Sequence, residues 1–202
     1  MISIINYGLG NIGSTINMLK HIGIEAKSES DPIKLSQSEK IILPGVGSFD
    51  VAMKQINNIE GLKDVLNYKA KVEKVPILGI CLGMQIMTRS SEEGEMKGLG
   101  WINADTKKFK LGKDLKVPHM GWNNVKANAS TGLTALNESD QRFYFVHSYY
   151  VKVDDQVNSL FKTNYGLEFD SGIVDQNIYG VQFHPEKSHK FGMNLLEKFA
   201  KL

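Results

Sequence analysis

The chain contains one cysteine, Cys81, and this residue lies between two glycines in the segment Gly79-Ile80-Cys81-Leu82-Gly83. An apolar run precedes the segment and a helical pattern follows it through residue 87, which predicts a buried strand that turns sharply into a helix. Glycines on both sides permit a strained turn that exposes the cysteine, and the helix N-terminus favours its thiolate. A single cysteine is more often a small buried residue, but this context favours a nucleophile.

A histidine and a glutamate form a second candidate group. His184 and Glu186 follow the apolar run 178–183, with Pro185 between them. In an extended segment, residues i and i+2 point the same way, and proline favours that extension, so the carboxylate could hold the imidazole. If both strand ends meet at one edge of a sheet, Cys81, His184 and Glu186 form a nucleophile, a base and an orienting residue. A metal site that also uses His189 is disfavoured, because no second ligand pair has a recognised spacing.

Two glycine-rich loops have alternative interpretations. Pro44-Gly45-Val46-Gly47 follows a predicted strand at residues 40–43, and its backbone N–H groups could stabilise an oxyanion. An ordinary strand-to-helix turn is the alternative. Gly8-Leu9-Gly10-Asn11-Ile12-Gly13 matches a dinucleotide-binding fingerprint, and Glu29 or Asp31 lies near the position of a ribose-binding acid. A dinucleotide-binding oxidoreductase is therefore one alternative, while close passage of the loop past a neighbouring segment is the simpler explanation.

The order of predicted elements indicates the fold. Strands and helices alternate over residues 2–87, which predicts an open, mostly parallel α/β sheet flanked by helices. Strand patterns dominate afterwards, at residues 99–102, 122–126, 142–147 and 149–153, which indicates an antiparallel extension. Residues 178–183 read as a further buried strand. The final helix carries an apolar stripe from Phe191 to Phe199.

Composition limits the classes of function. The length of 202 residues suits a single domain that spans residues 1–202. A formal net charge of +2, from 24 basic and 22 acidic residues, gives no electrostatic reason to expect nucleic acid. The longest apolar runs are too short to span a membrane, and the N-terminal residues read as a strand rather than a signal peptide. We therefore expect a cytoplasmic protein with no membrane or nucleic-acid partner.

The strand-to-helix turn at residues 79–83, called the elbow below, together with Gln182-Phe183-His184-Pro185-Glu186 resembles the class I, triad-type glutamine amidotransferases. Within that family, four further segments resemble the glutaminase subunits of imidazole glycerol phosphate synthase: residues 6–11, 44–47, 118–123 and 144–149. Because these segments extend from the first strand to the last helix, the resemblance covers essentially the whole chain. It implies a flavodoxin-like arrangement of the parallel sheet.

The resemblance implies a reaction without a cofactor or metal. Cys81 would attack the side-chain amide of L-glutamine and form a thioester, and water would release glutamate after ammonia has left. Backbone groups of Leu82 and of the loop at Val46 and Gly47 would hold the oxyanion. The glutamine pocket would be formed by Gly45, Gly47, Gln85, His147, Ser148 and Tyr149.

The resemblance also implies a heterodimer with a (β/α)8-barrel cyclase, which would use the ammonia to make imidazole glycerol phosphate and aminoimidazole carboxamide ribonucleotide in histidine biosynthesis. Such glutaminases are nearly inactive without their partner. The docking face would contain Asn11, Pro118, His119, Met120, Gly121, Trp122, Asn123 and Lys187. Two alternatives remain: a sibling glutaminase that serves a cyclase-like partner in surface-sugar biosynthesis, and a non-enzymatic binding module with a decayed site.

Overall fold

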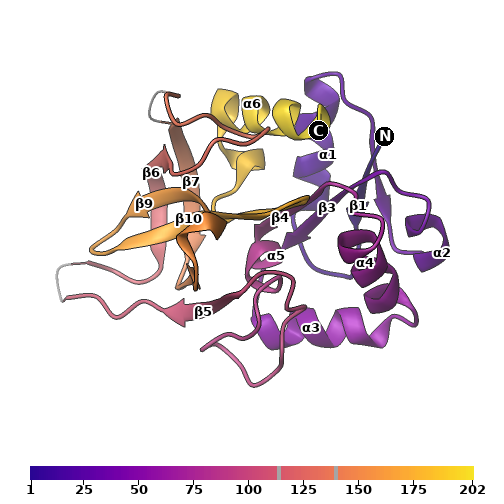
Figure 1. Cartoon of the computed structure of the whole chain (residues 1–202), viewed down its shortest axis with the longest axis horizontal. Coiled ribbons are helices and arrows are strands. Elements are labelled where there is room, and N and C mark those ends of the chain that lie inside the picture. Colours follow the sequence, from indigo (N-terminus) through magenta and orange to yellow (C-terminus); the bar gives the residue numbers. More distant parts are fainter. Residues whose placement is uncertain (113–114, 139–140) are drawn as a thin grey trace.

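The computed structural model describes residues 1–112, 115–138 and 141–202 (Figure 1). Its strands are β1 (Ile2–Ile5), β2 (Ala26–Glu29), β3 (Lys40–Gly45), β4 (Ile77–Cys81), β5 (Ala104–Lys108), β6 (His119–Ala127), β7 (Gln141–His147), β8 (Tyr149–Val153), β9 (Ser159–Asn164), β10 (Glu168–Asp175) and β11 (Ile178–Val181). Its α-helices are α1 (Ile12–His21), α2 (Pro32–Leu35), α3 (Phe49–Asn58), α4 (Leu62–Lys71), α5 (Leu82–Gln85) and α6 (His189–Ala200). Two 3₁₀ turns are η1 (Gln156–Asn158) and η2 (Pro185–Lys187).

The parallel part of the sheet has the strand order β2-β1-β3-β4-β11. All four neighbouring pairs in this order are parallel, and the order is that of flavodoxin-like folds if β11 is counted as the fifth strand. Gly45 at the end of β3 lies opposite Cys81 at the end of β4, and Val181 at the end of β11 lies opposite Ile80. The carboxyl ends of three strands therefore meet at one edge of the sheet.

The parallel strands are buried on both faces because helices cover each side. Alternate side chains point to opposite faces, so Ile41 and Leu43 join one apolar cluster, with α3 and α4, while Ile42 joins another, with α1 and α6. Figure 1 shows α1 and α6 on one side of the sheet and α3 and α4 on the other. This burial explains the continuous apolar runs in β3 and β4.

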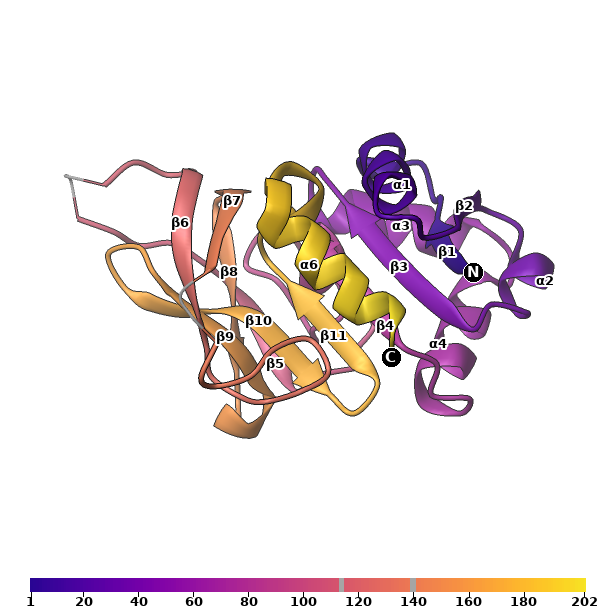
Figure 2. The same ribbon diagram turned by 90° about the horizontal axis from the view of Figure 1, so that it is seen from above.

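The antiparallel extension is confirmed. It continues from β11 through β10, β9 and β6 to β7, and a branch joins β8 to β10 and β5 to β8. Figure 2 shows these strands at one end of the molecule, far from β2. No helix of the described residues is both long enough and apolar enough to cross a membrane.

The predicted strand at residues 99–102 is wrong. Leu99 and Trp101 donate their backbone N–H groups to Ile86 and Met87, in the turn after α5, so they cannot pair with a neighbouring strand. The strand of this region is β5, which begins only at Ala104. Strands β9 and β10 also lie outside the ranges that the sequence pattern indicated.

Candidate active site

Cys81 carries the strain of the elbow itself. Its backbone has φ +55° and ψ −111°, a conformation that costs energy for a residue with a side chain and that is concentrated at functional sites. Neither Gly79 nor Gly83 has a positive φ. They are needed because neighbouring backbone leaves no room for a Cβ at these positions. A Cβ on Gly83 would lie 1.8 Å from the Leu43 carbonyl oxygen, and one on Gly79 would lie 2.8 Å from the Gly83 carbonyl.

The helix after Cys81 is shorter than predicted. α5 ends at Gln85 rather than continuing through residue 87, because the chain tightens there into i→i−3 bonds, from Met87 to Met84 and from Thr88 to Gln85. A single turn has a much weaker dipole than a long helix. Activation of Cys81 therefore depends more on its neighbours than on the helix terminus.

His184 and Glu186 form the predicted pair, but not through the predicted backbone. His184 Nδ1 lies 2.8 Å from Glu186 Oε1, and both side chains are 2% exposed. His184 itself is extended, whereas Pro185 begins the 3₁₀ turn η2, because the fixed φ of proline also suits the first position of a helical turn. The pair is thus made by a turn and not by the alternation of an extended strand.

The side chain of Ser188 stabilises the η2 turn through two hydrogen bonds. Its hydroxyl donates to the His184 carbonyl oxygen at 2.6 Å and accepts from the Tyr144 N–H at 3.0 Å. Ser188 is fully buried, so both bonds are protected from water. No role for Ser188 was predicted from the sequence.

The electrostatics favour a protonated His184. Burial alone would lower its pKa, but the neighbouring Cys81 and the Glu186 carboxylate outweigh burial and raise the pKa to about 10. Within the described part of the chain, His184 Nε2 has no hydrogen-bond partner. This nitrogen is therefore free to exchange a proton with a reacting group in the cavity.

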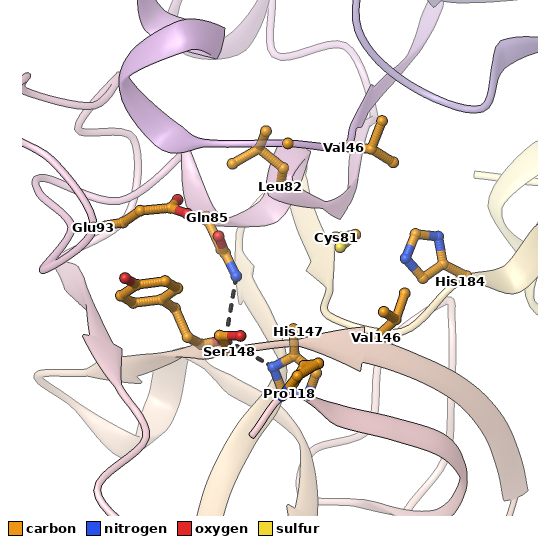
Figure 3. Close-up of a pocket in the computed structure, with 12 residues that line it drawn as sticks. Val46, Cys81, Leu82, Gln85, Glu93, Pro118, Val146, His147, Ser148 and His184 are labelled. Atoms are coloured by element: carbon orange, nitrogen blue, oxygen red, sulfur yellow. Dashed lines mark hydrogen bonds between the residues drawn. The ribbon is translucent and has the colours of Figure 1, made fainter. Parts of the chain in front are cut away.

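Cys81 and His184 line one cavity of about 340 Å³ (Figure 3), a size at the lower end for small-molecule sites. The predicted residues that line it are Val46, Gly47, Leu82, Gln85, His147, Ser148 and Tyr149. Glu93, Pro118 and Val146 also line it. Of these three, Pro118 was predicted at the docking face instead. Val146 lies in the segment 144–149 but was not predicted to line the pocket, and no sequence signal indicated Glu93.

Gly45, which was predicted to help form the glutamine pocket, lies next to the cavity-lining Val46 but does not line the cavity itself. It lies beside Cys81, where a Cβ would come within 2.9 Å of Leu82 Cβ and 2.7 Å of the Tyr7 hydroxyl. That hydroxyl donates to the Pro44 carbonyl oxygen at 2.6 Å, and burial followed by the charge of Cys81 raises the pKa of Tyr7. Gly45 therefore allows close packing behind the loop, and Tyr7 anchors the loop's base.

Glu93 is the carboxylate of the cavity. Its Oε2 accepts the backbone N–H of Phe49 at 2.8 Å, which fixes the side chain at the cavity wall. Gln85 is also fixed, because its side-chain amide donates to the Tyr149 carbonyl oxygen at 3.2 Å and to Gln182 Oε1 at 3.0 Å. Gln182 in turn donates to Cys81 Sγ at 3.7 Å. The cavity thus combines a thiol, a buried imidazole and a carboxylate.

The residues that were predicted to form the docking face differ in how exposed they are. Met120 and Trp122 of β6 are 61% and 40% exposed, and the Trp122 ring stacks on His189 with centroids 5.6 Å apart. Lys187 is exposed over the Tyr144 ring. The more internal members of the set are Asn11, Gly121 and Asn123, which are partly buried.

His119 does not lie on the docking surface. It is 2% exposed, because alternation along β6 turns its ring inward while Met120 points outward. There it stacks between Phe145, at 4.7 Å, and Tyr165, at 4.0 Å.

The glycine fingerprint after β1 has structural tasks. A Cβ on Gly10 would lie 3.0 Å from the Pro44 side chain, so the loop passes close to the end of β3. Glu29, the candidate ribose-binding acid, instead accepts the backbone N–H groups of Ser30 and Asp31. These contacts give Gly10 and Glu29 structural roles that do not involve a dinucleotide.

Comparison with known proteins agrees with this geometry. The family model described as Glutamine amidotransferase class-I matches residues 3–202. The imidazole glycerol phosphate synthase subunit HisH 2 of Methanococcus maripaludis is 56% identical, and the alignment covers 100% of this chain and 99% of that protein. The subunit of the same name from Pseudomonas aeruginosa is 46% identical, with full coverage of both chains.

Two solved structures share the fold. A crystal structure titled as a glutamine amidotransferase has a TM-score of 0.77 and 17% identity, with both chains fully covered. The structure of PurLQS from Thermotoga maritima has a TM-score of 0.73 and 19% identity, covering 99% of this chain and 97% of that one. Taken with the match over residues 3–202 and the full-length similarity to HisH subunits, these results place the chain in the class I glutamine amidotransferase family.

Proposed function

We propose that the chain is the glutaminase subunit of an imidazole glycerol phosphate synthase, in which Cys81, His184 and Glu186 hydrolyse L-glutamine to glutamate and ammonia. The observation that carries this proposal is the strained Cys81 in one cavity with a buried His184 that is hydrogen-bonded to Glu186. The family membership and the HisH relatives support it.

The acylation step uses the ion pair that the site favours. With its pKa raised to about 10, His184 holds a proton at neutral pH, and the Cys81 sulfur can attack the amide carbon as a thiolate. The new S–C bond pushes the carbonyl electrons onto oxygen. As the tetrahedral species collapses, the C–N bond breaks and His184 Nε2 gives its proton to the departing nitrogen, which leaves as ammonia.

Deacylation reverses the roles. Neutral His184 takes a proton from water as the water oxygen attacks the thioester carbon, and the C–S bond then breaks to release glutamate. Glu186 holds the imidazolium through Nδ1 in both steps. The charge on the ring is thus stabilised without leaving the buried turn.

The oxyanion would be held by backbone donors. Leu82 begins α5, so its N–H belongs to the first turn, whose N–H groups have no partner inside the helix. A second donor would come from the loop at Val46 and Gly47, which lines the same cavity. Each such donor typically contributes about 3 kcal/mol to stabilisation of the transition state.

The pocket suits glutamine through charge as well as shape. The Glu93 carboxylate lines the wall and would pair with the α-ammonium group of the substrate. Gln85, His147, Ser148 and Tyr149 would complete the pocket. An acidic substrate such as glutamate, which bears a second negative charge, should bind less well.

We also propose that the chain forms one domain and works in the cytoplasm as a heterodimer with a (β/α)8-barrel cyclase, giving the assembly its lyase activity. Met120 and Trp122 are exposed apolar residues of β6, and the rings of Trp122 and Tyr144 lie close together with Lys187 over Tyr144, so these residues give an apolar and basic face suited to docking. A sibling subunit with a cyclase-like partner in surface-sugar biosynthesis is the second candidate, because it would carry the same triad and loops. Rescue of a histidine auxotroph would distinguish these two pathways.

A glutamine analogue with a reactive diazoketone tests the chemistry directly. We expect the analogue to modify Cys81 stoichiometrically, as read by peptide mass spectrometry, and L-glutamine to protect against it. The variant His184→Ala should react far more slowly. Modification that glutamine does not slow would contradict a glutamine site and would favour a binding module with a decayed centre.

A further inference from the structure

A buried pair of histidines lies behind the pocket, and its hydrogen bonds define the tautomer of each ring. His147 Nδ1 lies 2.7 Å from the Tyr149 carbonyl oxygen, which can only accept, so Nδ1 carries the hydrogen. His147 Nε2 then accepts from His119 Nδ1 at 2.9 Å. The remaining nitrogen, His119 Nε2, accepts from the Asn123 amide at 3.1 Å.

The orientation of Asn123 is itself determined. Its amide nitrogen also donates to the Asn164 carbonyl oxygen at 2.9 Å, and its Oδ1 accepts the Asn124 N–H at 2.8 Å. Both donor hydrogens of the amide are therefore used. The arrangement is satisfied with both rings neutral. A proton added at His147 Nε2 would oppose the His119 Nδ1–H, and one added at His119 Nε2 would oppose the Asn123 amide N–H.

The same line of bonds continues to the nucleophile. The Tyr149 carbonyl oxygen accepts from His147 and also from Gln85, as the dashed lines of Figure 3 show. Gln85 donates its second amide hydrogen to Gln182 Oε1, and Gln182 donates to Cys81 Sγ. One continuous path thus connects Asn123, on the docking segment at residues 118–123, with the reacting sulfur.

We propose that His119 and His147 are positioning residues, which hold the Tyr149 carbonyl and thereby set Gln85 and Gln182 around the glutamine pocket and Cys81. His119 does this without lining the cavity, since only His147 reaches it. The proposal rests on the glutaminase function given above. Each ring acts as a directional link, because it donates from Nδ1 and accepts at Nε2.

Burial supports neutral rings. Desolvation lowers the pKa of His119 to about 4 and, as the main cause, lowers the pKa of His147 to about 3. His184 is among the groups that lower it further, so a cationic His147 would also oppose the protonated His184 that the chemistry needs. Both geometry and solvation therefore favour one protonation state.

The first test is spectroscopic and does not require activity. Histidine labelled with ¹⁵N in the rings should show, in long-range ¹H–¹⁵N spectra at pH 7, two neutral rings with hydrogen on Nδ1 for His119 and His147. The exposed His21 provides the reference for an ordinary ring. A hydrogen on Nε2 of either residue, or a protonated ring, would overturn the proposal whether or not the chain is a glutaminase.

The second test separates the hydrogen bond from ring packing. His119→Phe keeps an aromatic ring between Phe145 and Tyr165 but cannot donate, whereas His119→Asn places an amide N–H near the position of Nδ1. The matched control is Thr163→Val, which removes the buried bond from Thr163 to Ser171 at 2.7 Å, away from the cavity. Circular dichroism would verify that each variant is folded.

Loss of one hydrogen bond between His119 and His147 should weaken glutamine binding more than it slows turnover. Loss of one buried hydrogen bond corresponds to roughly tenfold, so we expect KM to rise about tenfold in His119→Phe with a smaller change in kcat. His119→Asn and Thr163→Val should stay within about twofold of the unmodified chain. An unchanged KM in His119→Phe, or an equal rise in Thr163→Val, would refute the positioning role. Absence of glutaminase activity in the unmodified chain assembled with a cyclase and its nucleotide ligand would instead refute the proposed function, while the ring tautomers would still test the path.

Discussion

Replacement of Glu186 by glutamine removes the negative charge beside His184 while nearly keeping the shape of the side chain. The side chains of Glu186 and His184 are both 2% exposed, and the bond between them is 2.8 Å long. A glutamine side chain has nearly the same shape, and its amide oxygen can still accept from His184 Nδ1. Its amide nitrogen would take the place of Oε2, which has no partner among the described residues, so the variant also buries an unpaired donor.

The size of the effect follows from the charge. A hydrogen bond to a charged group contributes about 1.5–3 kcal/mol and one between neutral groups about 0.5–1.5 kcal/mol, so the midpoints of these ranges give a cost of about 1 kcal/mol for Glu186→Gln, to which the unpaired donor adds. A loss of about 1.4 kcal/mol corresponds to a tenfold slower reaction and to a decrease of about one unit in the pKa of His184.

The direction of the pH effect is fixed by the proton that His184 must deliver. Activity should fall as pH rises through the pKa of His184, which is raised to about 10 in the intact site. In Glu186→Gln this decline should begin about one pH unit lower. The same raised pKa stabilises the folded chain fully below pH 6.5, and this contribution is lost as pH approaches 10.

The assay is the pH profile of Cys81 alkylation by the diazoketone analogue, together with glutamate release by the assembled enzyme. The control is Glu168→Gln, the same change at an exposed position, which should leave both profiles unchanged. If Glu186→Gln keeps the alkaline limb of the intact chain, then Glu186 does not control the protonation of His184 and the reasoning fails.

Three further substitutions test separate parts of the site. Gly83→Ala places a methyl group about 1.8 Å from the Leu43 carbonyl oxygen, so thermal unfolding should show a loss of several kcal/mol, and Gly13→Ala, which has open space, provides the comparison. Glu93→Gln keeps the hydrogen-bond acceptor but removes the charge, so KM for glutamine should rise about tenfold or more while kcat changes little; an unchanged KM would remove Glu93 from substrate recognition. Ser188→Ala leaves the Tyr144 N–H without its acceptor and removes one of the two donors to the His184 carbonyl oxygen, the other being the Lys187 N–H, so stability should fall by about 1–3 kcal/mol with a parallel fall in kcat; loss of stability alone would mean that the turn holds its shape without the hydroxyl.

The fold was predictable where local pattern and topology agree. The apolar strands β3 and β4 are visible in the sequence because helices cover both faces of the parallel sheet. By contrast, β9 and β10 depend on pairing with distant strands, and the irregular register between Asp170 and Gly172 disturbs their alternation. Residues 99–102 look like a strand, but their N–H groups are used by the turn after α5.

The meeting of Cys81 with His184 follows from topology, since the carboxyl ends of neighbouring parallel strands share one edge. The source of strain at the elbow does not follow from sequence, because it depends on how closely Gly83 approaches β3. Glu93 lies in an irregular segment with no periodicity to place it. His119 was predicted on the docking face, and only the pairing of β6 with β7 brings it against His147.

The most direct test of the central claim is glutamate release from L-glutamine, measured for the purified chain alone, for the chain with a candidate cyclase and its nucleotide ligand, and for Cys81→Ala in the same assembly. We expect glutamate release to be strong only in the assembly and to disappear when Cys81 is replaced by alanine. Release that persists in Cys81→Ala would contradict the thioester mechanism.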